Sequence, residues 1–178
     1  MGQVERTKRD IIAAFQGLLQ KQNFDDITVD AICKAALVNR TTFYRYFPSK
    51  VELALALISR IFADLAAADN TDLVGQFCDF FDDNRALIRH LLPETQGKFY
   101  GEFVRLVADY LNAAADPVHE TNDPLVAAIR QSISPPIMSK FMANALIGLS
   151  KEALASSDMQ NIDGAKAFLR DAVMKLAR

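Results

Sequence analysis

Residues 39–46 carry polar and aromatic side chains with no acidic residue among them. They are Asn39, Arg40, Thr41, Thr42, Tyr44, Arg45 and Tyr46. An ordinary solvated helix mixes both charge signs, because oppositely charged side chains four residues apart stabilise it by about 0.2–0.5 kcal/mol per pair. Guanidinium groups and hydroxyls are instead the donors that bind phosphate oxygens and base edges. The composition of this stretch therefore indicates a surface for a nucleic acid.

Two phenylalanines determine which way this stretch faces. Phe43 and Phe47 are four residues apart, so they share one face of a helix over residues 40–47 and predict its buried side. Asn39 is a suitable N-cap for that helix, and Pro48 ends it. The remaining side chains of the stretch then point outward.

The next helix begins with a cation in an unfavourable place. Residues 49–52 read S-K-V-E, a capping box that opens a long helix to about residue 68. Lys50 then lies at the positive end of the helix dipole, at a cost of about 0.3–1 kcal/mol. Either a phosphate docks at this helix end beside the ammonium, or Lys50 is solvated and the cost is tolerated.

Two further helices are expected before this stretch. Residues 7–20 have the spacing of an amphipathic helix, and Thr28 caps a short helix that ends near residue 36, with Asp30 in its first turn. Two short helices joined by a few residues and preceded by a longer one indicate a helix-turn-helix. The alternative is an ordinary three-helix bundle, which the acid-free outer face of residues 39–46 disfavours.

Residues 27–53, ITVDAICKAALVNRTTFYRYFPSKVEL, resemble the tetracycline-repressor (TetR) family of transcriptional regulators. The recognisable pattern covers about the first 55 residues, and the rest of the chain is similar only in length and helix order. The resemblance implies that the helix over residues 40–47 enters the DNA major groove, and that Asn39 caps it. It implies base or near-base contacts for Arg40, Thr41, Thr42 and Arg45. It implies phosphate contacts for Thr28, Tyr44, Tyr46 and Lys50.

One position departs from this family. The turn between the two short helices often has a glycine where this chain has Leu37. A non-glycine residue in the left-handed conformation costs about 1–2 kcal/mol. We expect either that the turn adopts another geometry or that Leu37 recovers the cost by packing.

The rest of the chain also has helical spacing, and glycine and proline number only 7 and 6 among 178 residues. We expect an all-α protein of about nine helices, with a helix-turn-helix DNA-binding domain over residues 1–50. A helical effector-binding and dimerisation domain follows over residues 51–178, and the helix from Ser49 to about Ala68 connects the two. The net charge of −2 conceals an asymmetry, because residues 1–50 carry eight basic and five acidic side chains.

A helix-turn-helix protein usually binds as a dimer, since two recognition helices then lie one DNA turn, about 34–36 Å, apart. The last two predicted helices, near residues 136–156 and 163–177, have apolar stripes that suit an interface between two copies. The alternative is that the stripes only build the core of one copy. The predicted interface residues are Phe141, Ala145, Gly148, Leu149, Phe168, Leu169, Ala172, Val173 and Leu176.

The middle helices are rich in aromatic residues, which fill protein cores well. The resemblance implies an apolar cavity for a small effector among these helices, and ligand binding there would shift the helix that carries Lys50. The predicted pocket residues are Phe77, Phe81, His90, Phe103, Tyr110 and Met142. His90 is the polar group of such a pocket, or else a solvated or core histidine.

Other classes of protein lack support in the sequence. There is no glycine-rich phosphate loop, no G-x-S-x-G elbow and no H-E-x-x-H metal motif, so we expect no enzyme, no metal and no cofactor. No run of about 18 apolar residues predicts a membrane span, and Cys33 and Cys78 read as reduced core residues of a cytoplasmic protein. Three alternatives remain. Residues 51–178 dock a partner protein instead of a small ligand, the protein activates transcription instead of repressing it, or, remotely, the chain is a helical-bundle enzyme.

Overall fold

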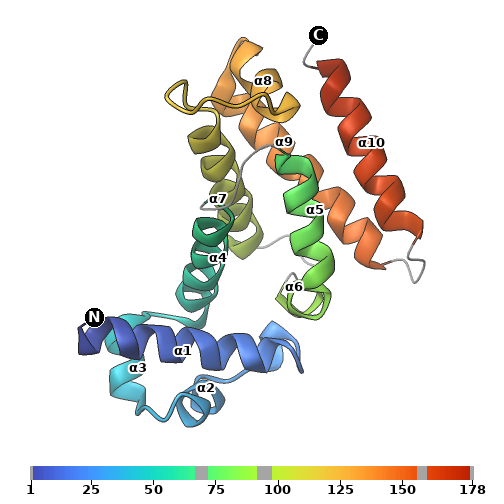
Figure 1. Ribbon diagram of the computed structural model, residues 1–178. Helices are drawn as coiled ribbons and strands as arrows, with labels where there is room; N and C mark the ends of the chain where they lie inside the picture. The colour runs from blue at the N-terminus through green and yellow to red at the C-terminus, as the bar shows by residue number, and fades with distance from the viewer. Residues whose placement is uncertain (1, 67–71, 92–97, 156–159, 177–178) are drawn as a thin grey trace.

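The computed structural model describes residues 2–66, 72–91, 98–155 and 160–176, and every regular element in these ranges is helical (Figure 1). The described ranges hold ten α-helices and one 3-10 turn, so the expected all-α class is confirmed and the expected count of about nine is one short. The elements are α1 Gln3–Leu19, η1 Phe24–Asp26, α2 Val29–Ala35, α3 Arg40–Tyr46, α4 Lys50–Ala66, α5 Leu73–Asp83, α6 Arg85–Leu91, α7 Lys98–Ala114, α8 Pro124–Gln131, α9 Pro135–Ala155 and α10 Gln160–Leu176.

Helices α1 to α3, here called the head, form one end of the molecule (Figure 1). Phe15 of α1, Ile32 of α2 and Phe43 of α3 are completely buried in its core. Helices α2 and α3 are short, and each buries only one or two large side chains, so their other faces stay exposed to solvent. The predicted helix-turn-helix is therefore present, with α1 as its supporting helix.

The turn between α2 and α3 places Leu37 in the left-handed conformation, which is costly for a residue other than glycine. Leu37 has a φ of 55°, and its side chain is 93% exposed. The expectation that Leu37 packs is therefore wrong, as is the expectation of another turn geometry. Two backbone hydrogen bonds close the end of α2, from Val38 N–H to the Cys33 carbonyl at 3.0 Å and from Leu37 N–H to the Lys34 carbonyl at 3.4 Å. This pair is a Schellman motif, which satisfies helix-end carbonyls and so offsets part of the strain.

Helix α4 leads from the head into the second region, α5 to α10, here called the body (Figure 1). Its predicted start is confirmed, because the Ser49 hydroxyl accepts a hydrogen bond from Glu52 N–H at 3.1 Å. Leu53 and Leu57 of α4 are completely buried. The predicted helix end near Ala68 lies outside the described residues.

The body is built on α7, which packs against α9 and α4. The Phe62 ring of α4 lies 6.5 Å from the Phe103 ring and 5.3 Å from the Tyr110 ring, both of α7. Helix α10 packs against α5, α8 and α9. No helix among the described residues is long and apolar enough to span a membrane.

A buried carboxylate joins two helices of the body. Asp123, only 1% exposed, caps α8 by accepting from Leu125 N–H at 2.7 Å and from Val126 N–H at 3.1 Å. Its other oxygen accepts from Leu73 N–H at 2.7 Å, at the start of α5. One side chain therefore fixes the relative positions of two helix ends that are 50 residues apart in the chain.

Candidate nucleic-acid interface

Helices α2 and α3 both begin with a side-chain cap. Thr28 accepts from Ala31 N–H at 3.1 Å, and Asn39 accepts from Thr42 N–H at 2.7 Å. The predicted cap by Asn39 is confirmed. Both caps are exposed, so these residues hold the helix starts at the surface and not in the core.

Helix α3 divides as the sequence predicts into a buried and an outward face. Phe43 is completely buried, and Phe47, which follows the helix, is 5% exposed. Two of the remaining predicted contact residues, Thr42 and Tyr46, are half-buried, and Tyr46 packs against the core. The members of the set that are exposed on α3 itself are Arg40, Thr41, Tyr44 and Arg45.

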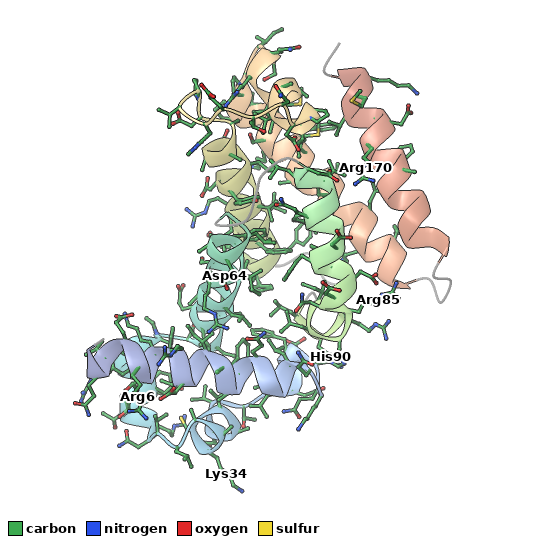
Figure 2. The ribbon with its side chains drawn as sticks, in the orientation of Figure 1. Arg6, Lys34, Asp64, Arg85, His90 and Arg170 are labelled. Carbon is green, nitrogen blue, oxygen red and sulfur yellow. The ribbon has the colours of Figure 1, made fainter. Side chains whose placement is uncertain are left out.

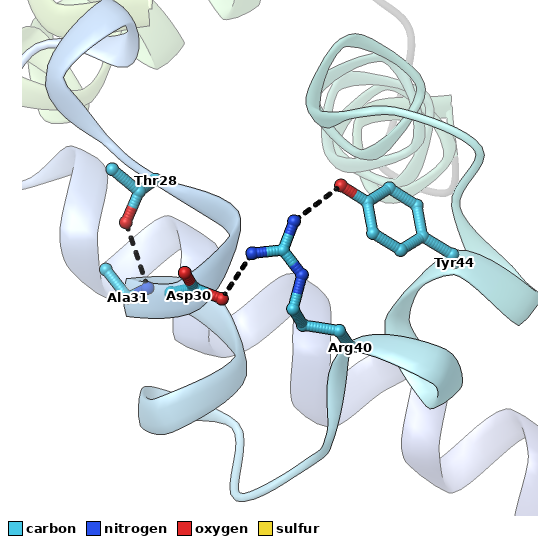
Figure 3. Close-up of polar contacts among 5 residues, drawn as sticks. All are labelled: Thr28, Asp30, Ala31, Arg40 and Tyr44. Carbon is cyan, nitrogen blue, oxygen red and sulfur yellow. Dashed lines mark hydrogen bonds and ion pairs between the residues drawn. The ribbon is translucent and has the colours of Figure 1, made fainter.

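An acid missed by the sequence analysis lies beside this surface. Asp30 of α2 accepts a hydrogen bond from Arg40 Nη1 at 2.8 Å, across the turn between the two helices (Figure 3). Arg40 Nη2 lies 3.5 Å from the Tyr44 hydroxyl. The hydrogen bond to Asp30 is the main reason that the pKa of the Arg40 guanidinium is raised. Position 30 was interpreted only through the dipole of α2, and the ten-residue separation gave no local signal of the pair.

Lys50 has partners that the sequence did not predict. Its ammonium donates to the backbone carbonyls of Phe24 at 2.5 Å, Ile27 at 2.8 Å and Asp25 at 3.3 Å. It also lies 4.3 Å from the centre of the Phe24 ring. Burial lowers the pKa of Lys50, although the nearby Asp25 and Asp26 charges act in the opposite direction. The carbonyls of the η1 turn thus explain a cation at the start of α4 without a phosphate, and the phosphate contact stays a prediction.

The head contacts the body at two further points. The Phe24 ring is stacked on the Phe99 ring of α7, with centroids 5.5 Å apart and an angle of 13° between the planes. His90 of α6 places Nδ1 2.7 Å from the Leu19 carbonyl oxygen, at the end of α1 (Figure 2). His90 therefore has a partner at the junction with the head, and its place as the polar group of an effector pocket stays a prediction.

The other predicted pocket residues lie in the body core. Phe77, Phe81, Phe103 and Met142 are buried, and Phe77 and Phe81 contact each other with ring centroids 4.7 Å apart. Tyr110 is half-buried, and burial, followed by the Asp123 charge, raises its pKa.

A pocket of about 230 Å³ lies elsewhere in the body, between α5, α8 and α10. None of the six predicted pocket residues lines it. Its wall is mainly apolar, and the ion pair between Asp72 and Arg170 borders it. The lining residues are Asp72, Val74, Asp123, Pro124, Leu125, Arg170, Val173 and Met174.

The predicted interface residues of α9 and α10 fall into three groups. Phe141 and Phe168 are 58% and 60% exposed, as an interface between two copies requires. Val173 is buried within the protomer and lines the pocket between α5, α8 and α10, and its place at an interface stays a prediction. The half-buried members are Ala145, Gly148, Leu149 and Ala172, and the side chains of Leu169 and Leu176 lie outside the described residues. The sequence analysis missed Ile137 and Met174, which are also exposed.

Residues 11–57 match the family model of bacterial regulatory proteins of the tetR family. The chain is 43% identical over 58 residues to the HTH-type transcriptional regulator EthR of Mycobacterium tuberculosis (strain H37Rv), a match covering 32% of this chain and 27% of EthR. It is 36% identical over 69 residues to DhaS of Lactococcus lactis, an HTH-type transcriptional activator of the dhaKLM operon, covering 39% and 36% of the two chains. This chain thus spans about a quarter of the length of the EthR relatives that it matches.

The fold of the whole chain has solved counterparts. A TetR transcriptional regulator from Rhodococcus sp. RHA1 superposes with a TM-score of 0.64 over 96% of each chain, at 17% sequence identity. At this identity the likeness concerns the fold alone. The family model therefore covers most of the head, and the structural likeness extends to the body.

Proposed function

We propose that the chain is a member of the tetR family of bacterial regulatory proteins, whose model matches residues 11–57, and that it is a sequence-specific DNA-binding transcriptional regulator that acts as a repressor. The observation that carries the proposal is the outward face of α3, where Arg40, Thr41, Tyr44 and Arg45 are exposed at one end of the molecule. The tetR family consists of transcriptional regulators, so no enzymatic activity is proposed. We also propose a cytoplasmic location, where a bacterial regulator meets DNA.

The proposal assigns two kinds of contact to the head. Helix α3 enters the major groove, where Arg40, Thr41, Thr42 and Arg45 meet base edges or lie near them. Backbone phosphates are bound by Thr28, Tyr44 and Tyr46. The first kind sets sequence preference, and the second sets affinity for any duplex.

The body completes the proposed regulator. We assign DNA binding to residues 1–50 and dimer formation and effector binding to residues 51–178. A homodimer through α9 and α10 would cover the exposed Ile137, Phe141, Phe168 and Met174. Exposed apolar side chains that gather on two neighbouring helices favour association over a monomer in water.

A small apolar effector is the remaining part of the proposal. It would bind in the body, in the pocket between α5, α8 and α10 or among the rings around Phe103, and weaken operator binding. A coupling of about 1–3 kcal/mol corresponds to a 5–150-fold change in affinity. A partner protein that docks on the body, or an activating role like that of the relative DhaS, is the alternative.

Selection of bound sequences from a random duplex pool tests the DNA-binding role. We expect a palindrome whose half-sites are centred about one DNA turn apart. Arg45→Ala should reduce enrichment, while Arg105→Ala on α7, which removes an equal charge from an exposed side chain outside the head, should not. A pool without any enriched sequence would overturn the proposal.

Lys50→Ala decides between the two roles of this side chain. If Lys50 binds a phosphate as well as the carbonyls, its loss lowers the slope of log affinity against log salt by about 0.9, in addition to lowering the stability of the free protein. If it only holds the η1 carbonyls, the free protein loses stability and the salt slope is unchanged. Thermal unfolding and binding measured at several salt concentrations separate the two results.

Effector binding is tested by screening small apolar molecules for an increase in Tm and then for loss of operator affinity. Val74→Phe narrows the pocket between α5, α8 and α10, whereas Phe103→Leu alters the ring cluster. A molecule whose effect is lost in only one variant identifies its site. If none of the molecules changes operator affinity and a partner protein does, the body docks a protein.

A further inference from the structure

A pair of exposed charges joins the two helices of the helix-turn-helix. The carboxylate of Asp30 and the guanidinium of Arg40 are 2.8 Å apart, and their side chains are 68% and 58% exposed. Exposed ion pairs contribute little to stability. The packing of α2 against α3 already rests on the buried Ile32, Cys33 and Phe43. The pair is therefore poorly explained as a device that stabilises the head.

The acid also carries an electrostatic disadvantage for a DNA-binding surface. Asp30 lies beside the acid-free outer face of α3 and reduces the attraction of that face for phosphates. A carboxylate in this place is useful only if it supplies something other than charge. The direction that it imposes on the Arg40 side chain is such a contribution.

The guanidinium of Arg40 is held from two sides. Asp30 accepts from Nη1, while the Tyr44 hydroxyl lies 3.5 Å from Nη2 and the Tyr44 ring centre lies 5.8 Å from Cζ (Figure 3). A guanidinium has five N–H groups, so these two contacts leave three. Two parallel N–H donors are what the O6 and N7 acceptors of guanine require. Arg40 is also the first residue of α3, at the helix end nearest the turn.

We propose that Asp30 is a positioning residue that holds the Arg40 guanidinium ready to read a guanine edge in the operator. The inference rests on the proposed DNA-binding function and adds a residue and a base to it. An arginine side chain has many rotamers, and fixing its plane before binding reduces what must be ordered in the complex. Asp30 thereby acts on sequence preference through Arg40 without touching the base itself.

The test compares selected sequences for the wild-type protein, Asp30→Asn, Arg40→Ala and the double variant. Wild type should prefer guanine at one position of each half-site, and Arg40→Ala should lose about tenfold of this preference. Asp30→Asn keeps the size of the side chain but weakens its hold on the guanidinium, and it should lose about three- to tenfold at the same position. In the Arg40→Ala background, the same change at position 30 should alter the preference no further.

Asp26→Asn is the matched control. Asp26 is an exposed acid of the η1 turn, so its replacement removes an equal negative charge from the head. It should raise affinity for all duplexes slightly and leave the base preference intact. The positioning role is overturned if Asp30→Asn behaves like Asp26→Asn, because Asp30 then only subtracts charge. It is also overturned if the affected base pair differs from that of Arg40→Ala.

The design separates this inference from the proposed function. If the wild-type protein enriches no sequence, the proposed sequence-specific binding to DNA is itself refuted. A wild-type protein that enriches a palindrome, with Asp30→Asn enriching the same palindrome to the same degree at every position, refutes only the role of Asp30. Thermal unfolding of each free variant is measured in parallel, since a merely structural role would lower Tm without changing a single base position.

Discussion

The head and the body of this protein differ in the side chains that characterise them, which are exposed in the head and buried in the body. In the head, side chains such as Arg40 and Tyr44 are exposed on one short helix, α3, and the family model matches this region. In the body, the buried rings around Phe103 dominate, and Phe62 of α4 packs against them. The likeness to the Rhodococcus regulator extends across the body, at only 17% identity over the chain. Many combinations of apolar side chains fill a core of the same shape, whereas a surface that reads DNA needs particular groups at particular positions.

The largest expected loss of unfolding free energy comes from removing a buried ring in either region, and it tests whether the two regions unfold together. Phe15→Ala in the head and Phe103→Ala in the body each remove a completely or almost completely buried ring, and each should cost about 3–5 kcal/mol. The contacts of Phe24 with Phe99 and of His90 with Leu19 join the regions, so we expect one cooperative transition in urea for both variants. Circular dichroism at a fixed protein concentration measures this. Two separate transitions, with each variant moving only one, would show independent regions.

A smaller effect contrasts the helix caps of the two regions. Asp123→Ala in the body leaves three buried N–H groups without their acceptor and should cost about 3 kcal/mol. Asn39→Ala in the head removes an exposed cap and should cost about 1 kcal/mol. Urea unfolding compares the two free energies. Equal losses would mean that burial does not decide the strength of a cap here.

A gain in stability is expected at one position of the head. Leu37→Gly relieves the left-handed strain, less the conformational freedom that glycine adds to the unfolded chain, for a net gain of about 0.5–1 kcal/mol. Leu37→Ala keeps the strain and serves as the control, with little change in stability. Thermal unfolding of both variants tests this, and an equal gain in the two would place the cost in the exposed leucine side chain instead of in the backbone.

The smallest expected effect is a pH dependence that originates in the body. The pKa of Tyr110 is raised above 10.0, chiefly by burial, so the folded state favours the neutral phenol. Its contribution to stability is complete below pH 10 and is lost as the pH rises through the folded-state pKa, because the unfolded chain ionises first. Wild type should therefore lose stability relative to Tyr110→Phe as the pH rises above 10.0 in urea titrations. A constant difference between the two proteins would contradict this.

Local signals made the helix starts predictable from the sequence. Thr28, Asn39, Ser49 and Asp123 each stand before a helical stretch, and each accepts a hydrogen bond from that helix in the structure. A cap involves residues two or three positions apart, so its pattern is visible in the chain. The all-α class and the two faces of α3 follow from spacing of the same kind.

Contacts between distant residues were not predictable in this way. The pairs of Asp30 with Arg40, Lys50 with the η1 carbonyls, and His90 with Leu19 depend on how one helix meets another. Val173 shows the same limit, because helical spacing defines an apolar stripe but not the element that covers it. For this reason spacing alone indicates the outer face of α3 more directly than it indicates a pocket or an interface, and the predicted pocket and interface residues stay predictions.

The contacts of Phe24 make this position suitable for a fluorescent probe of the junction between head and body. Its ring lies beside the Lys50 ammonium and is stacked on the Phe99 ring, and the chain contains no tryptophan. Phe24→Trp would therefore place the sole indole of the protein at the point where the two regions meet. Its fluorescence would depend on the distance of the ammonium and on access to water, so a single emission spectrum would follow movements of the head relative to α7.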